Sequence, residues 1–172
     1  MKIETYLEGA DLRSIGRSND LVKLVRTQAD FDRLFDFLFH SDRLKVMRAA
    51  DSIEKITVKH PSYLKPHYKK LLALSSVAEN KELKWHLAQL LPRMEMNNRE
   101  RAGAWKILFN WASSPLESRI VRVNALEGLA CLSVARQQDQ EKFNQLLEKI
   151  SKENILSLNA RIRKLKKPSN KT

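Results

Sequence analysis

Residues 68–91, YKKLLALSSVAENKELKWHLAQLL, contain two groups of apolar positions separated by a polar break at residues 79–82. The positions in each group are three and four residues apart: Tyr68, Leu71, Leu72 and Ser75, then Leu83, Leu87, Leu90 and Leu91. This spacing places each group on one face of a helix. The stretch therefore predicts two helices joined by a short turn, each with a single apolar face.

The first of these helices has three counterparts elsewhere in the chain. Its leading aromatic position corresponds to Phe31, Trp105 and Phe143, at intervals of 37, 37 and 38 residues. A fixed interval of this size is typical of stacked helical hairpins, because a single hairpin cannot bury its own apolar face. The sequence predicts an all-α fold, an α-solenoid of about four HEAT-like hairpin repeats.

Length and composition predict one ordered domain over residues 1–165 of the 172-residue chain and a basic tail over 166–172. The single cysteine, Cys131, stands in an apolar run and is expected to be a buried, unreactive thiol. Residues 1–8 contain acidic side chains where a signal peptide would be basic and then apolar. No apolar stretch is long enough to cross a bilayer, so we expect a cytoplasmic protein with no membrane partner.

The formal net charge is +12, and residues 161–172 contain six basic side chains and no acidic one. Half of the excess is therefore in the last twelve residues, and the other half is spread over the body. A basic chain attracts anionic partners, including nucleic acids. The charge by itself does not decide between a nucleic acid and an acidic protein.

The second helices also repeat, with a small residue at Ala50, Ala88, Ala125 and Ala160. The segments VMRAA at 46–50 and RIVRVNAL at 119–126 resemble the second helix of HEAT repeats. The segments DLRSIGRS at 11–18 and WHLAQ at 85–89 resemble a family of small prokaryotic HEAT-like proteins. The resemblance covers nearly the whole chain and implies an armadillo-type α-solenoid. It transfers no functional residues.

In such stacks the second helices line a concave face that is the usual binding surface. A 38-residue offset places Arg48 beside His86, and Asp51 beside Gln89. Trp85, Gln89 and Arg93 follow one another at four-residue steps and form one stripe. The candidate contact residues are Arg48, Asp51, Trp85, His86, Gln89, Arg93 and Arg122. The alternative is that Trp85 covers the edge of the core and the polar groups pair with one another.

No catalytic or cofactor motif is present. The four histidines have no partners at metal-ligand spacing, and the four glycines form neither a phosphate loop nor a dinucleotide fingerprint. We therefore expect no cofactor, no metal and no enzymatic activity.

The favoured function is a non-catalytic interaction module that binds a protein partner, with Trp85 and an arginine as anchors. On this interpretation, replacing both Trp85 and Arg122 with alanine abolishes partner capture and leaves stability unchanged. The alternative is nucleic-acid binding through the basic groove and tail. One form of it resembles HEAT-like alkylpurine DNA glycosylases, which combine a basic concave face with an aromatic residue and an acid, here Trp85 and Asp51.

Overall fold

The computed structural model describes residues 3–8 and 17–167, and these residues form helices and connecting turns with no strand among them. The prediction of an all-α fold is confirmed. The α-helices are α1 (Glu4–Leu7), α2 (Ser18–Leu24), α3 (Gln28–Phe35), α4 (Arg43–Lys59), α5 (Tyr68–Val77), α6 (Lys81–Leu90), α7 (Asn98–Ser113), α8 (Arg119–Ser133), α9 (Gln137–Ser151) and α10 (Leu156–Lys166). Three 3-10 helices join them: η1 (Asp36–Phe39), η2 (Pro61–His67) and η3 (Leu91–Arg93).

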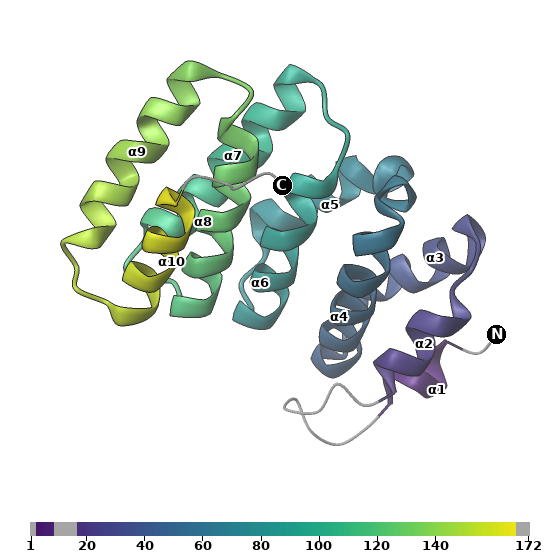
Figure 1. The fold of residues 1–172 in the computed structure, drawn as a ribbon. Helices are drawn as coiled ribbons and strands as arrows, with labels where there is room; N and C mark the ends of the chain where they lie inside the picture. The colour runs from purple at the N-terminus through teal and green to yellow at the C-terminus, as the bar shows by residue number, and fades with distance from the viewer. Residues whose placement is uncertain (1–2, 9–16, 168–172) are drawn as a thin grey trace.

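The even-numbered helices lie side by side in one row (Figure 1): α2 packs on α4, α4 on α6, α6 on α8, and α8 on α10. The preceding odd-numbered helix packs against its partner in each case, α3 on α4, α5 on α6, α7 on α8 and α9 on α10. The chain thus advances by one helical pair at a time, and side chains from consecutive even-numbered helices share one face of the molecule.

Polar side chains fix where several helices begin. Asn97 accepts hydrogen bonds from the backbone N–H groups of Arg99 and Glu100 at the start of α7, and Glu100 accepts one from the backbone N–H of Asn97. Asp42 accepts one from the N–H of Leu44 at the start of α4. These bonds pair N–H groups that have no partner within the helix. Asp and Asn are among the residue types preferred at this position.

The repeated apolar positions form the core of the odd-numbered helices. Phe31 and Phe143 are buried, whereas Tyr68 and Trp105 are half-buried and pack against the core. The Trp105 indole also donates a hydrogen bond of 3.0 Å to the Ser133 hydroxyl on α8. Burial of polar aromatic rings is favourable when their polar atom has such a partner. The four aromatic positions thus have related packing roles in the four pairs.

The small residues of the even-numbered helices follow the predicted pattern in three cases out of four. Ala50, Ala88 and Ala125 are fully buried, but Ala160 is exposed. The reason is its interval of 35 residues from Ala125, because a two-residue shift turns a helix position by about 200°. Ile162, at an interval of 37, takes the buried position and is 4% exposed.

No helix of the described ranges is sufficiently long and apolar to cross a membrane. Helix α10 continues to Lys166, and residues 168–172 of the predicted tail lie outside the described residues. Most of the segment at residues 11–18 that resembles the prokaryotic HEAT-like family also lies outside them, since the description resumes at Arg17.

Candidate partner-binding face

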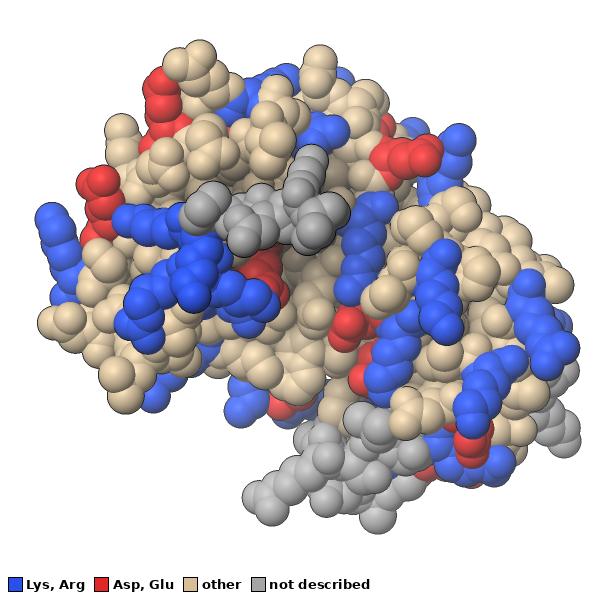
Figure 2. Space-filling view, in the orientation of Figure 1, with Lys and Arg blue, Asp and Glu red and all other residues tan. Residues whose placement is uncertain are grey.

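The face made by α4, α6, α8 and α10 is strongly charged. Figure 2 shows Lys and Arg side chains gathered over α10 on one side and over α2 and α4 on the other, with fewer acidic side chains between them. The predicted contact residues belong to α4, α6, η3 and α8. Their hydrogen-bond partners decide which of them are available to a partner.

Glu54 of α4 joins three of the predicted residues from α6 and η3. Its carboxylate lies 3.1 Å from the Nδ1 of His86 and accepts a hydrogen bond of 3.2 Å from Gln89. Arg93 donates to the Glu54 backbone carbonyl at 2.5 Å and to the Thr57 hydroxyl at 3.0 Å, and its other terminal nitrogen lies 3.4 Å from the carboxylate. These contacts attach α6 and η3 to α4.

The environment of Glu54 keeps its carboxylate ionised. Burial alone would raise the pKa of the Glu54 carboxyl, but the hydrogen bonds and charges of His86 and Arg93 outweigh burial and hold the pKa below its ordinary value. The His86 residue is 3% exposed, so the His86–Glu54 contact is shielded from solvent on its imidazole side.

Glu54 was absent from the residues predicted from the sequence. The 38-residue offset pairs residues that point in the same direction on neighbouring helices, such as Asp51 and Gln89. Contact between two neighbours instead requires the flanks that face each other, and on α4 this flank includes Glu54, one turn after Ala50. An acidic residue on that flank, opposite a stripe of His, Gln and Arg, was the signal that could have identified it.

Arg48 is buried at 1% exposure and has its partners inside the molecule. Its guanidinium donates to the backbone carbonyl of Leu7 at 3.2 Å and to that of Glu8. These carbonyls belong to the end of α1, where helical carbonyls lack partners within the helix. Arg48 therefore attaches α1 to α4 and offers no surface to a partner.

Arg122 is also 1% exposed, and it joins three segments. Its Nε donates to the Ala112 carbonyl at the end of α7 at 2.9 Å. Its two terminal nitrogens each lie 2.7 Å from one carboxylate oxygen of Glu153, in the turn between α9 and α10. This bidentate pairing holds the pKa of the Glu153 carboxyl below its ordinary value, mainly through the hydrogen bonds from Arg122. The predicted contact role does not suit a side chain with this burial.

Asp51 and Trp85 both contact neighbouring residues of the chain. Asp51 accepts a hydrogen bond of 2.6 Å from the Ser18 hydroxyl and one of 2.7 Å from the Lys55 ammonium group. Trp85 is half-buried against the core, and its ring centroid lies 4.9 Å from that of His86. The exposed part of Trp85 keeps its place among the predicted contact residues, whereas the Asp51 carboxylate accepts both of its hydrogen bonds at Oδ2.

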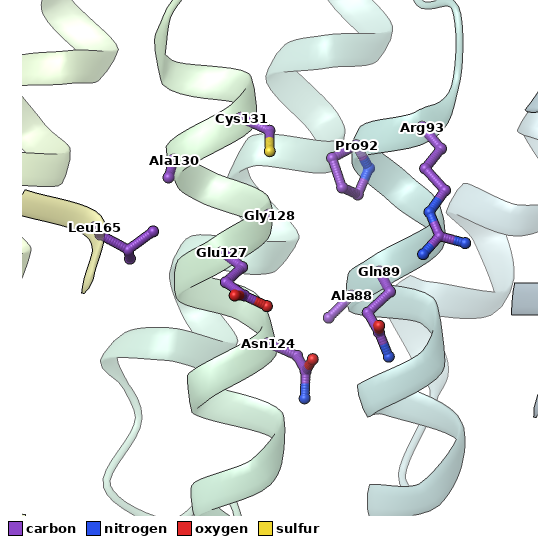
Figure 3. A pocket seen from close by; sticks show the side chains of 10 residues that line it. All are labelled: Ala88, Gln89, Pro92, Arg93, Asn124, Glu127, Gly128, Ala130, Cys131 and Leu165. Carbon is purple, nitrogen blue, oxygen red and sulfur yellow. The ribbon is translucent and has the colours of Figure 1, made fainter. Parts of the chain in front are cut away.

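A groove of about 350 Å³ opens between α6, α8 and α10. Figure 3 shows Gln89 and Arg93 on one side of this groove and Asn124 and Glu127 on the other. Its floor is apolar and is formed by Ala88, Pro92, Gly128, Ala130, Cys131 and Leu165. We refer to it as the α6–α8–α10 groove.

Cys131 corrects one prediction, because its side chain is exposed in this groove and not buried. The apolar run around it was interpreted as uniformly buried, but a helix at the surface turns one side of such a run outward. The neighbouring Ala130 is half-buried, whereas Leu129 and Leu132 face the core.

Within residues 3–8 and 17–167 no three His, Cys, Asp or Glu side chains come together as a metal site would require. The described side chains of the face form hydrogen bonds, ion pairs and apolar contacts. Comparison of the sequence and fold with models of known protein families, with curated proteins and with solved structures gave no significant match.

Proposed function

We propose that the chain is an α-solenoid of four HEAT-like hairpins that acts as a non-catalytic interaction module and binds a protein segment in the α6–α8–α10 groove. The hairpins are the pairs α3–α4, α5–α6, α7–α8 and α9–α10. Their repeated aromatic and small residues, at a nearly constant interval, support the repeat assignment.

The chemistry of the groove carries the proposal. Its floor is apolar, and polar atoms with spare hydrogen-bonding capacity stand on both sides of it. The Gln89 amide donates its N–H to Glu54, and the Asn124 amide donates its N–H to the Ile120 carbonyl at 2.8 Å. Both amide oxygens remain able to accept from the backbone N–H groups of a peptide. An apolar floor with a few fixed polar groups is typical of binding clefts.

The internal ion pairs make the groove rigid. Glu54 holds α6 against α4, and Arg122 holds α8 against the turn before α10. Glu127 of α8 pairs with Arg161 of α10 across the far side of the groove. A pre-formed groove loses less entropy on binding than a flexible one. The buried side chains of Arg48, His86 and Arg122 thus serve the function by positioning helices, while Gln89, Arg93 and the exposed part of Trp85 contact the partner.

The test replaces Cys131, the single cysteine of the chain, whose side chain is exposed in the groove. Purified protein is immobilised and exposed to nuclease-treated native lysate, and bound proteins are identified by mass spectrometry. Capture is compared between the unmodified protein, a Cys131→Trp variant that fills the groove, and a Gln145→Trp variant as control. Gln145 is exposed on α9, outside the groove.

We expect the unmodified protein and the Gln145→Trp variant to retain the same partner and the Cys131→Trp variant to lose it. A direct titration follows, in which each of the three proteins is added to the identified partner segment, which carries a fluorophore, and the fluorescence anisotropy of the segment is measured. Equal capture by all three proteins would refute the groove as the binding site. A segment that binds the Cys131→Trp variant as tightly as the unmodified protein would refute it as well.

A further inference from the structure

A second pocket, of about 380 Å³, lies between the C-terminal ends of α2 and α4, apart from the α6–α8–α10 groove. Val22, Val25 and Ile56 form its apolar wall. The remaining lining residues are basic or imidazole side chains, namely Lys23, Arg26, Lys55, Lys59 and His60. None of the described residues that line it is acidic. We call it the α2–α4 pocket.

Most of the positive charge of this pocket is not neutralised within the described chain. Lys55 is neutralised, because its ammonium group lies 2.7 Å from Asp51 and 2.8 Å from the Asn19 amide oxygen. The side chains of Lys23, Arg26 and Lys59 are exposed and have neither an ion pair nor a hydrogen bond to any described residue. Three such cations around one pocket attract and concentrate anions.

The nearby acidic groups do not cancel this charge, because they have internal partners. The Glu54 carboxylate contacts His86 and Arg93. The Asp51 carboxylate accepts a hydrogen bond from Ser18 and pairs with Lys55. Lys23 and Lys59 stand in the last turns of α2 and α4, where a cation also stabilises the helix end. That role does not account for Arg26, which follows α2 and lines the same pocket.

The aromatic ring of His60 lies beside these cations and favours an anionic ligand that also has a flat ring. The exposed His60 ring stacks on the half-buried Tyr63 ring, with centroids 5.3 Å apart and an angle of 20° between their planes. Tyr63 is itself fixed by a hydrogen bond of 3.0 Å from its hydroxyl to the Arg26 carbonyl. A fixed flat ring next to cations matches the two parts of a nucleotide, the base and the phosphate.

We propose that the α2–α4 pocket binds a single-stranded nucleic acid, with backbone phosphates on Lys23, Arg26 and Lys59 and a base against His60. The basic side chains that extend over the same face (Figure 2) would continue the contact along the strand. An acidic peptide would use the cations but gain little from the ring. A free polyphosphate would use the cations alone.

The proposal is tested by fluorescence anisotropy with a labelled mixed-sequence single-stranded oligonucleotide over a series of salt concentrations. The pocket variant is Lys23→Gln/Arg26→Gln/Lys59→Gln. The matched control, Lys69→Gln/Lys106→Gln/Lys142→Gln, removes the same charge from exposed positions on α5, α7 and α9. Because all six side chains are exposed, both variants are expected to melt at the temperature of the unmodified protein.

We expect the pocket variant to bind the oligonucleotide on the order of tenfold to hundredfold more weakly, with the slope of log K against log salt reduced by about 2, since each phosphate contact contributes about 0.7. The control variant should change affinity by less than about threefold, because long-range charge effects on exposed groups are screened by salt. His60→Ala should weaken oligonucleotide binding by roughly fivefold to tenfold and leave polyphosphate binding unchanged.

Several results would overturn the proposal. These are no binding by the unmodified protein, equal losses in the two triple variants, and polyglutamate bound as tightly as the oligonucleotide. An oligonucleotide affinity unaffected by His60→Ala would reduce the pocket to a simple anion site and refute the nucleic-acid assignment. None of these results depends on the α6–α8–α10 groove, so the two proposals fail separately.

Discussion

The pairing of Arg122 with Glu153 gives the sharpest prediction about stability, because its two partners differ in burial. The Arg122 residue is 1% exposed, and the Glu153 side chain is 27% exposed. Removing the carboxylate leaves a buried cation whose remaining acceptor among the described residues is the Ala112 carbonyl. Removing the arginine leaves a carboxylate that water can reach.

The expected free-energy costs follow from this asymmetry. Glu153→Ala should destabilise the fold by about 3–5 kcal/mol, because it leaves a buried charge uncompensated. Arg122→Met should cost about 1–3 kcal/mol, mostly for the unpaired Ala112 carbonyl. The double variant should cost less than the sum of the two, since methionine removes the charge that makes the loss of Glu153 expensive.

The assay is thermal unfolding followed by far-UV circular dichroism, with urea unfolding for the free energies of all four members of the cycle. For a chain of this length, 1 kcal/mol corresponds to about 2–4 °C, so Glu153→Ala should lower the midpoint by about 6–20 °C. A larger loss from Arg122→Met than from Glu153→Ala would refute the reasoning. Additive losses would also refute it, because they would mean that the two side chains are not coupled.

Two further predictions concern packing and pH. Gly128→Ala should destabilise the fold by about 1–3 kcal/mol in urea unfolding, since a Cβ would lie 2.8 Å from Leu108 and 2.9 Å from the Ala88 carbonyl oxygen. Gly103→Ala, with nothing within 4 Å of the added Cβ, is its control and should stabilise α7 by about 0.5–1 kcal/mol; equal effects of the two changes would contradict this account. Glu54→Gln should lower the free energy of unfolding at neutral pH. The difference from the unmodified protein should become smaller as the pH falls below 4.5, the ordinary pKa of a Glu carboxyl. The reason is that a carboxyl with a lowered pKa stabilises the fold only while it is ionised. A difference that is constant from neutral to acid pH in urea titrations would show that the Glu54 charge is not involved.

The sequence predicted the helices well and the roles of their polar residues less well. Apolar spacing and capping residues are local, so the starts at Asp42 and Asn97 could be predicted from neighbouring residues alone. The same spacing could not give lateral contacts, because these depend on which flanks of α4 and α6 face each other. Glu54 was missed for this reason, and Arg122 was placed on a surface from which it is buried. The exposed Cys131 shows the same limit within one apolar run.

The repeat pattern also directs attention to polar side chains that a partner cannot reach. Side chains at equivalent positions of successive helices, such as Arg48 and His86, are buried and are used to join one helix to the next. The charges that a partner can meet are those that the stacking leaves without a counterion. Around the α2–α4 pocket these include Lys23 and Lys59, in the last turns of α2 and α4. In a row of packed helices, the cations available to a partner are therefore those that remain after each acidic group has paired with its internal partner.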